Sequence, residues 1–158
     1  MTSPSRIELC RDFNGALYAE FIRYAFATSD EAYFVVRDEV QKGPNVVAVM
    51  KRVAPHLIAE REVCEWPGTR LHGGIVARLF KFSTADPVMR LFLEVTDHLW
   101  GWQHPDLPED IGFRDLEGRV VIESTTHERY LSMIVDSARR TILKARFPDL
   151  ALVLLNDA

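Results

Sequence analysis

The residues best suited to chemistry lie in WGWQHPDLPEDIGF, which occupies positions 100–113. Two indoles accompany three carboxylates that fall within five positions and repel one another unless they cap backbone N–H groups or face a cation. Aromatic anchors dominate binding energies, and charge complementarity speeds encounter. The stretch therefore predicts a recognition loop for a basic partner. Its functional side chains are Trp100, Trp102, His104, Asp106, Glu109 and Asp110.

The alternative interpretation of this stretch is structural. Pro105 and Pro108 would fix an extended connection between a helix and a strand, while both indoles plug the end of the core and the acids are solvated. The two interpretations differ in whether Trp100 and Trp102 are exposed.

A second candidate, His127-Glu128, lies in STTHERY at positions 124–130, between two predicted strands. A hairpin tip there would expose the imidazole. If His127 approached Asp106 or Glu109 across the end of the sheet, an acid–base pair or a metal site would form, because imidazole and carboxylate suit both roles. No ligand spacing supports this hypothesis, and a turn histidine bonded to a neighbouring backbone is the alternative.

Two other features resemble ligand sites but have simpler explanations. Gly73-Gly74 leads into a predicted strand, whereas a phosphate-binding turn leads from a strand into a helix, so the pair predicts a bend. The last predicted helix carries four cations near the negative end of its dipole, without the interleaved aromatics that typify single-stranded nucleic-acid binding. The cations are Arg139, Arg140, Lys144 and Arg146.

Composition favours an ordinary globular domain. The chain has 158 residues, with 19 basic and 23 acidic side chains and a net charge of −4, which disfavours nonspecific binding to nucleic acid or anionic lipid. The apolar run at 150–155 is too short to cross a bilayer and predicts a buried strand. Cys10 and Cys64 lack C-x-x-C spacing, and the first residues lack an apolar signal core, so we expect reduced thiols in the cytosol.

Periodicity and turn residues predict the elements that position these stretches. A final strand that is apolar on both faces should lie centrally in its sheet. The order of elements predicts a single α+β domain, with about four helices on a mixed or largely antiparallel sheet of five to six strands. We expect helices over 15–27, from Gly43-Pro44-Asn45 to about 62 with a break at Pro55, over 86–99 and over 136–146, and strands over 32–37, 75–82, 112–115, 119–125, 130–135 and 151–155.

Three motifs carry a resemblance to known proteins. They are EWPGTRL at 65–71, the pattern W-x-x-P-D-L-P-E-D-x-x-F at 102–113, and the pair HE at 127–128. Together they resemble a family of small uncharacterised bacterial α+β proteins. The resemblance implies a bacterial cytosolic source and one domain covering most of the chain. It brings no established activity, and therefore no catalytic residue.

Three hypotheses for function follow. The first is a non-catalytic protein-binding module without a cofactor, for instance an immunity protein that neutralises a basic toxin through the stretch at 100–113 together with His127-Glu128. The rival is a small metal-assisted hydrolase, which predicts that its side chains converge in a pocket with perturbed pKa values. The third, an oligomerising subunit, predicts an exposed apolar sheet face or edge. The hydrolase would use His104, Asp106, His127 and Glu128.

Overall fold

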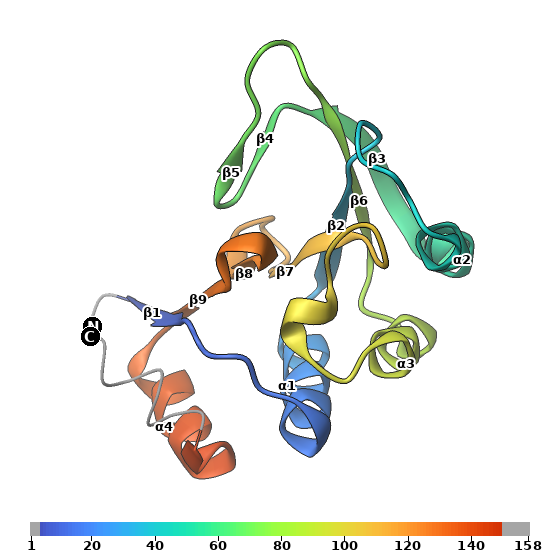
Figure 1. The fold of residues 1–158 in the computed structure, drawn as a ribbon. Helices are drawn as coiled ribbons and strands as arrows, with labels where there is room; N and C mark the ends of the chain where they lie inside the picture. Colours follow the sequence, from blue (N-terminus) through green and yellow to red (C-terminus); the bar gives the residue numbers. More distant parts are fainter. Residues whose placement is uncertain (1–3, 150–158) are drawn as a thin grey trace.

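A computed structural model describes residues 4–149 of the chain. A seven-stranded sheet forms the centre, in the order β1-β9-β8-β7-β2-β6-β3, and every neighbouring pair is antiparallel. Four α-helices within residues 4–149 pack apolar side chains against one face of this sheet. The β4–β5 hairpin, called the arm below, rises beyond the other elements and packs against the opposite face (Figure 1).

The bounds of the elements are as follows. The helices are α1 (Gly15–Thr28), α2 (Pro44–Val53), α3 (Asp86–Val95) and α4 (Ser137–Arg146), with 3-10 turns η1 (Ala54–His56), η2 (Leu99–Gly101) and η3 (Thr126–Glu128). The strands are β1 (Ser5–Leu9), β2 (Glu31–Val36), β3 (Leu57–Val63), β4 (Glu65–Trp66), β5 (Thr69–Arg70), β6 (Ala77–Ser83), β7 (Glu109–Arg114), β8 (Val120–Thr125) and β9 (Tyr130–Val135).

Strand β2 lies near the middle of the sheet and is buried on both faces. Phe34 and Val36 point to the helix face, where they join the main core. Tyr33 and Val35 point to the other face and form a smaller cluster with Trp66 of the arm. Because successive side chains of a strand alternate between faces, this strand explains why the domain has two apolar clusters.

Aromatic side chains dominate the main core. The ring of Phe92 in α3 lies 5.0 Å from that of Phe26 in α1 and 4.4 Å from that of Trp102, measured between centroids. Aromatic rings at these separations add to the free energy of burial.

Helix α4 begins at a side-chain cap, since Asp136 Oδ1 accepts the backbone N–H of Arg139 at 2.7 Å.

The predicted α+β class, the four helices and the largely antiparallel sheet are confirmed, but the prediction of five to six strands is wrong. One missed strand, β3, falls where the second helix was expected to continue. Pro55 ends that helix through η1, and the chain then runs extended from Leu57. The other missed strand of the seven-stranded sheet is β1, in which Ile7 and Leu9 are buried between exposed neighbours, and the short strands β4 and β5 of the arm were also not predicted.

Three other expectations concern the ends and loops of the chain. The strand predicted over 151–155 lies outside the described residues. Gly73 and Gly74 form the expected bend before β6, with φ values of 71° and 77°. The two cysteines are both free and exposed. The helices of residues 4–149 are too short or too polar to cross a bilayer.

Candidate functional site

Two of the three motifs singled out in the sequence meet beneath the arm, beside η3, the 3-10 turn that contains the third. Trp66 Nε1, from EWPGT, donates a hydrogen bond of 2.8 Å to Asp110 Oδ2, from PDLPED. Asp110 Oδ1 accepts the backbone N–H of Thr126 at 2.7 Å, and Thr126 Oγ1 accepts the backbone N–H of Asp110 at 3.3 Å. Residues far apart in the chain are thus joined by one buried carboxylate.

The turn of the arm fits closely against the end of β8. Gly68 has a φ of 85°, in the region that favours glycine. A Cβ atom at this position would overlap Thr125 Oγ1. The Pro-Gly turn of EWPGT therefore serves both the backbone conformation and the approach of the arm to the sheet.

Asp110 is placed by an irregularity in β7. Its φ is 58°, and the pairing of β2 with β7 shifts register between Tyr33 and Val35. Bulges of this kind re-aim a side chain, and here the carboxylate is fully buried. Burial raises the pKa of Asp110, while the bonds from Thr126 and Trp66 and the charge of His127 oppose that rise. With both oxygens occupied, Asp110 holds the arm in place.

Glu109, next to it, is a buried carboxyl with incomplete pairing. Its side chain is 8% exposed, and Oε1 has no hydrogen-bond partner among residues 4–149. Arg37 Nε lies 3.7 Å from this oxygen, but Arg37 is bound to Glu39, whose Oε1 accepts from Nε at 2.6 Å. Burial, followed by the negative charge of Asp110, raises the pKa of Glu109 to about 7. Glu109 therefore changes protonation near neutral pH.

His104 is held by the backbone at the end of β2. Its Nε2 accepts the N–H of Arg37 at 3.0 Å, so the neutral ring carries its proton on Nδ1. That Nδ1 atom is buried and has no hydrogen-bond partner in the described part of the chain. Burial, then the positive charges of Lys42 and Arg37, lower the pKa of His104. This imidazole is thus neutral, and its Nδ1–H is available to donate a hydrogen bond. Asp106, two residues further on, is exposed.

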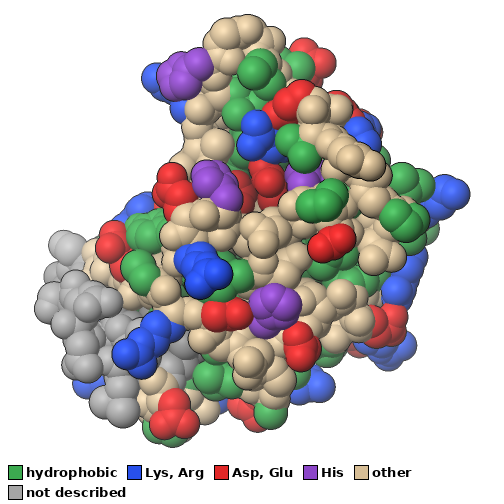
Figure 2. Space-filling view, in the orientation of Figure 1, with side chains coloured by type: hydrophobic (Ala, Val, Ile, Leu, Met, Phe, Trp, Pro, Cys, Tyr) green, Lys and Arg blue, Asp and Glu red, His purple; other side chains and the backbone are tan. Residues whose placement is uncertain are grey.

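His127 and Glu128 lie at the tip between β8 and β9, as expected. Both are exposed, and His127 Nε2 lies 3.8 Å from Glu128 Oε1. Figure 2 shows acidic and histidine side chains gathered where the surface is hollowed between the arm and the body of the domain. Within residues 4–149, no three His, Cys, Asp or Glu side chains are grouped as ligands for a metal ion.

The predicted recognition loop is wrong in its central feature, because the indoles are inside. Trp100 is 5% exposed and Trp102 is 0% exposed. Trp102 Nε1 donates to Tyr18 Oη at 2.9 Å, and that hydroxyl donates to the carbonyl of Phe92 at 2.9 Å. Burial of the indoles and of Glu109 and Asp110 leaves His104, Asp106, His127 and Glu128 as the partly or fully exposed members of the predicted binding set.

The sequence analysis assigned no functional role to two side chains that contact Glu109 or Asp110. Trp66 was singled out only as part of the EWPGTRL motif, although its indole N–H makes the bond that fixes the arm. Arg37 was recognised only as the end of a strand. The signal for Trp66 was present, since a Trp beside a Pro-Gly turn brings a large apolar side chain with one donor to a tight bend. No comparable signal marked Arg37.

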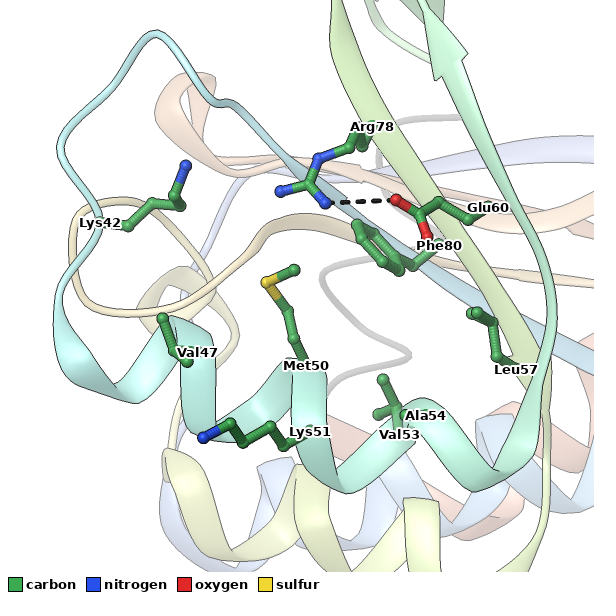
Figure 3. A pocket seen from close by; sticks show the side chains of 10 residues that line it. All are labelled: Lys42, Val47, Met50, Lys51, Val53, Ala54, Leu57, Glu60, Arg78 and Phe80. Atoms are coloured by element: carbon green, nitrogen blue, oxygen red, sulfur yellow. Dashed lines mark hydrogen bonds and ion pairs between the residues drawn. The ribbon is translucent and has the colours of Figure 1, made fainter.

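An open site lies elsewhere, between α2 and the β3 edge of the sheet (Figure 3). This α2–β3 groove has a volume of about 420 Å³. In Figure 3, Met50 and Phe80 point into it, Leu57 closes one side, and Lys42 and Lys51 lie on the other. Its walls are formed by Lys42, Val47, Met50, Lys51, Val53, Ala54, Leu57, Glu60, Arg78 and Phe80.

The charges at the groove are unequally paired. Arg78 is held by Asp38, at 2.7 Å from both Nε and NH2, and by Glu60 at 3.2 Å from NH1. Lys42 Nζ binds Asp38 at 2.7 Å. Lys51 forms no ion pair with any residue in the described part of the chain. The groove therefore combines an apolar interior with one unneutralised cation.

No protein-family model, curated protein or solved structure matches this chain. The resemblance expected from the three motifs therefore stays a prediction.

Proposed function

We propose that this chain is a non-catalytic protein-binding module whose partner inserts an apolar side chain into the α2–β3 groove. The groove is the observation that carries the proposal. Its volume of about 420 Å³ lies in the range of ligand sites, and its lining is largely apolar, with few polar groups. Filling it with an aliphatic or aromatic side chain removes apolar surface from water on both partners.

A protein partner fits better than a small molecule because two apolar walls of the groove, Val47 and Leu57, are themselves exposed at the surface. Val47 at its margin is 45% exposed, and Ile58 on the neighbouring strand is 50% exposed. Leu57, which is the first residue of β3 and a wall of the groove, is also exposed. Clusters of exposed apolar side chains of this kind mark interaction sites on soluble proteins.

The charge of the groove favours a carboxylate beside the inserted side chain. Lys51 is unneutralised, whereas Lys42 and Arg78 are already paired with acids. An Asp or Glu of the partner would complete the pairing. The basic partner expected from the sequence depended on an exposed loop, in which Glu109 and Asp110 are instead buried.

Nothing in the geometry specifically favours the hydrolase hypothesis. Asp110 uses both carboxylate oxygens to hold the arm and the η3 turn. His104 uses Nε2 for the backbone of Arg37. The four side chains assigned to the hydrolase are not assembled into a metal-ligating group within residues 4–149.

Selection from a displayed library of random peptides tests the proposal. We expect enriched peptides to carry an aliphatic or aromatic residue next to Asp or Glu. Ala54→Trp would fill the groove and weaken those peptides about 30-fold, since burying one large apolar side chain contributes about 2 kcal/mol. The matched control is Ala138→Trp, at an exposed position of α4 on another helix, and it should leave the affinity unchanged.

A charge reversal tests the role of the cation. Lys51→Glu should weaken the selected peptides several-fold, and more at low salt than at high salt. Lys144→Glu makes the same change of charge on α4 and serves as the control. Peptides that bind Ala54→Trp and Lys51→Glu as tightly as the unmodified protein would contradict the proposed function.

A further inference from the structure

We infer that the partner segment binds as an extended strand added to the free edge of β3, and this inference rests on the proposed function. Within residues 4–149, β3 is the last strand of the sheet and has β6 as its one hydrogen-bonded neighbour. A terminal strand presents unpaired N–H and C=O groups that template another strand. Strand addition draws affinity from main-chain bonds and specificity from pockets for alternate side chains.

The edge and the groove belong to one surface. Leu57 and Glu60 of β3 are both walls of the groove. Glu60 lies opposite Phe80 of β6, a side chain on the helix face of the sheet. A side chain of the added strand that faces the helices would therefore adjoin the mouth of the groove, as the position of Glu60 in Figure 3 illustrates.

A partner of complementary charge fits the charged half of β3 better than a second copy of this chain, because self-pairing centred there sets like charges opposite each other. Two copies related by a two-fold axis would pair β3 with β3 so that one residue lies opposite itself. Centring on Glu60 or Glu62 places two carboxylates opposite each other. Centring on Arg61 places two guanidinium groups opposite each other and also sets Glu60 against Glu62. Like charges directly opposite destabilise a strand pair.

The same charges specify a complementary strand. Arg61 and Glu62 form no ion pair with the described residues, and they point to opposite faces because they are adjacent in β3. An antiparallel partner should carry a cation opposite Glu62, an acid opposite Arg61 and an apolar residue opposite Glu60. In chain order, the partner motif reads Lys or Arg, then Asp or Glu, then an apolar residue that enters the groove. The acid opposite Arg61 points away from the helix face, so the carboxylate that pairs with Lys51 is a different residue of the partner.

Backbone N-methylation of a peptide selected as above tests strand addition. Methyl groups on alternate residues remove the N–H groups that face β3 in one frame and leave them intact in the other. We expect one frame to lose binding by about tenfold or more, since each lost main-chain bond costs about 1 kcal/mol, and the other to bind normally. Equal affinity of both methylated peptides would overturn the inference.

Amide exchange and charge exchange complete the test. Binding should slow hydrogen exchange at those β3 amides that are not bonded to β6. Arg61→Glu should weaken the selected peptide several-fold, and exchanging the peptide's acidic residue for Lys should restore it. A peptide whose affinity falls in Ala54→Trp, but which protects no β3 amide and binds Arg61→Glu as tightly as the unmodified protein, refutes strand addition and leaves the proposed function intact. A peptide whose affinity is unchanged in Ala54→Trp refutes the proposed function instead.

Discussion

Replacing Glu109 with Gln should change how the stability of the protein depends on pH. The pKa of Glu109 is raised from 4.5 to about 7 in the folded protein, chiefly by burial, so the folded state holds this proton more tightly than the unfolded chain. The resulting stability is complete below the unfolded pKa and is lost as the pH rises through the folded pKa. The whole rise corresponds to about 3 kcal/mol, of which about 2 kcal/mol is lost between about pH 5.5 and about pH 8.5.

Glu109→Gln keeps the shape of the protonated acid and cannot ionise. Urea unfolding of the unmodified protein and of the variant at several pH values gives the difference in the free energy of unfolding. We expect that difference to move by about 2 kcal/mol in favour of Gln between about pH 5.5 and about pH 8.5. The control is Glu128→Gln, an exposed carboxylate on the η3 turn. Parallel pH profiles for the unmodified protein and Glu109→Gln would refute the assignment of a buried, underpaired carboxyl.

Three further substitutions test the arm and the helix cap. Trp66→Phe removes the donor to the buried Asp110 carboxylate, and thermal unfolding should show a loss of about 2 kcal/mol, with faster proteolysis at the arm. Gly68→Ala forces a side chain into a positive φ and against Thr125, so we expect a lower Tm, and unchanged stability would contradict the close packing of the turn. Asp136→Ala removes the cap of α4 and should cost about 1 kcal/mol in urea unfolding, whereas Asp136→Asn should retain most of it.

The sequence predicted those elements whose local signals agree with their tertiary surroundings. Helix α1 has apolar residues at helical spacing, and α4 begins at a capping Asp and ends near a Pro. The bend predicted at Gly73-Gly74 also corresponds to positive φ values.

The second half of the region predicted as one helix shows why local signals were insufficient. Residues 57–63 contain Leu, Ile, Ala, Glu and Arg, which suit a helix as well as an edge strand. Pairing with β6 decides the outcome, and that pairing involves residues distant in sequence. The α2–β3 groove depends on this strand, so a site bounded by α2, β3 and β6 could not be found before β3 was known.

The indoles illustrate the opposite error. Trp100 and Trp102 are two positions apart, so in an extended segment they point to the same side. This spacing does not distinguish a surface from a core. Trp102 Nε1 is satisfied by Tyr18, 84 positions away in the sequence, and a buried indole requires such a partner. The meeting of EWPGT and PDLPED at the η3 turn likewise depends on hydrogen bonds between residues distant in sequence, although the residue types were visible in the sequence.

The most direct test of the central claim is a titration of methyl-labelled methionine with a library-selected peptide, followed by NMR. Met50 points into the α2–β3 groove, whereas Met133 is buried in β9, which four other strands separate from β3 in the sheet. We predict a saturable shift of the Met50 methyl signal, an unchanged Met133 signal, and loss of the Met50 shift in Ala54→Trp. Tight peptide binding that leaves the Met50 methyl signal unmoved would show that the partner surface lies elsewhere.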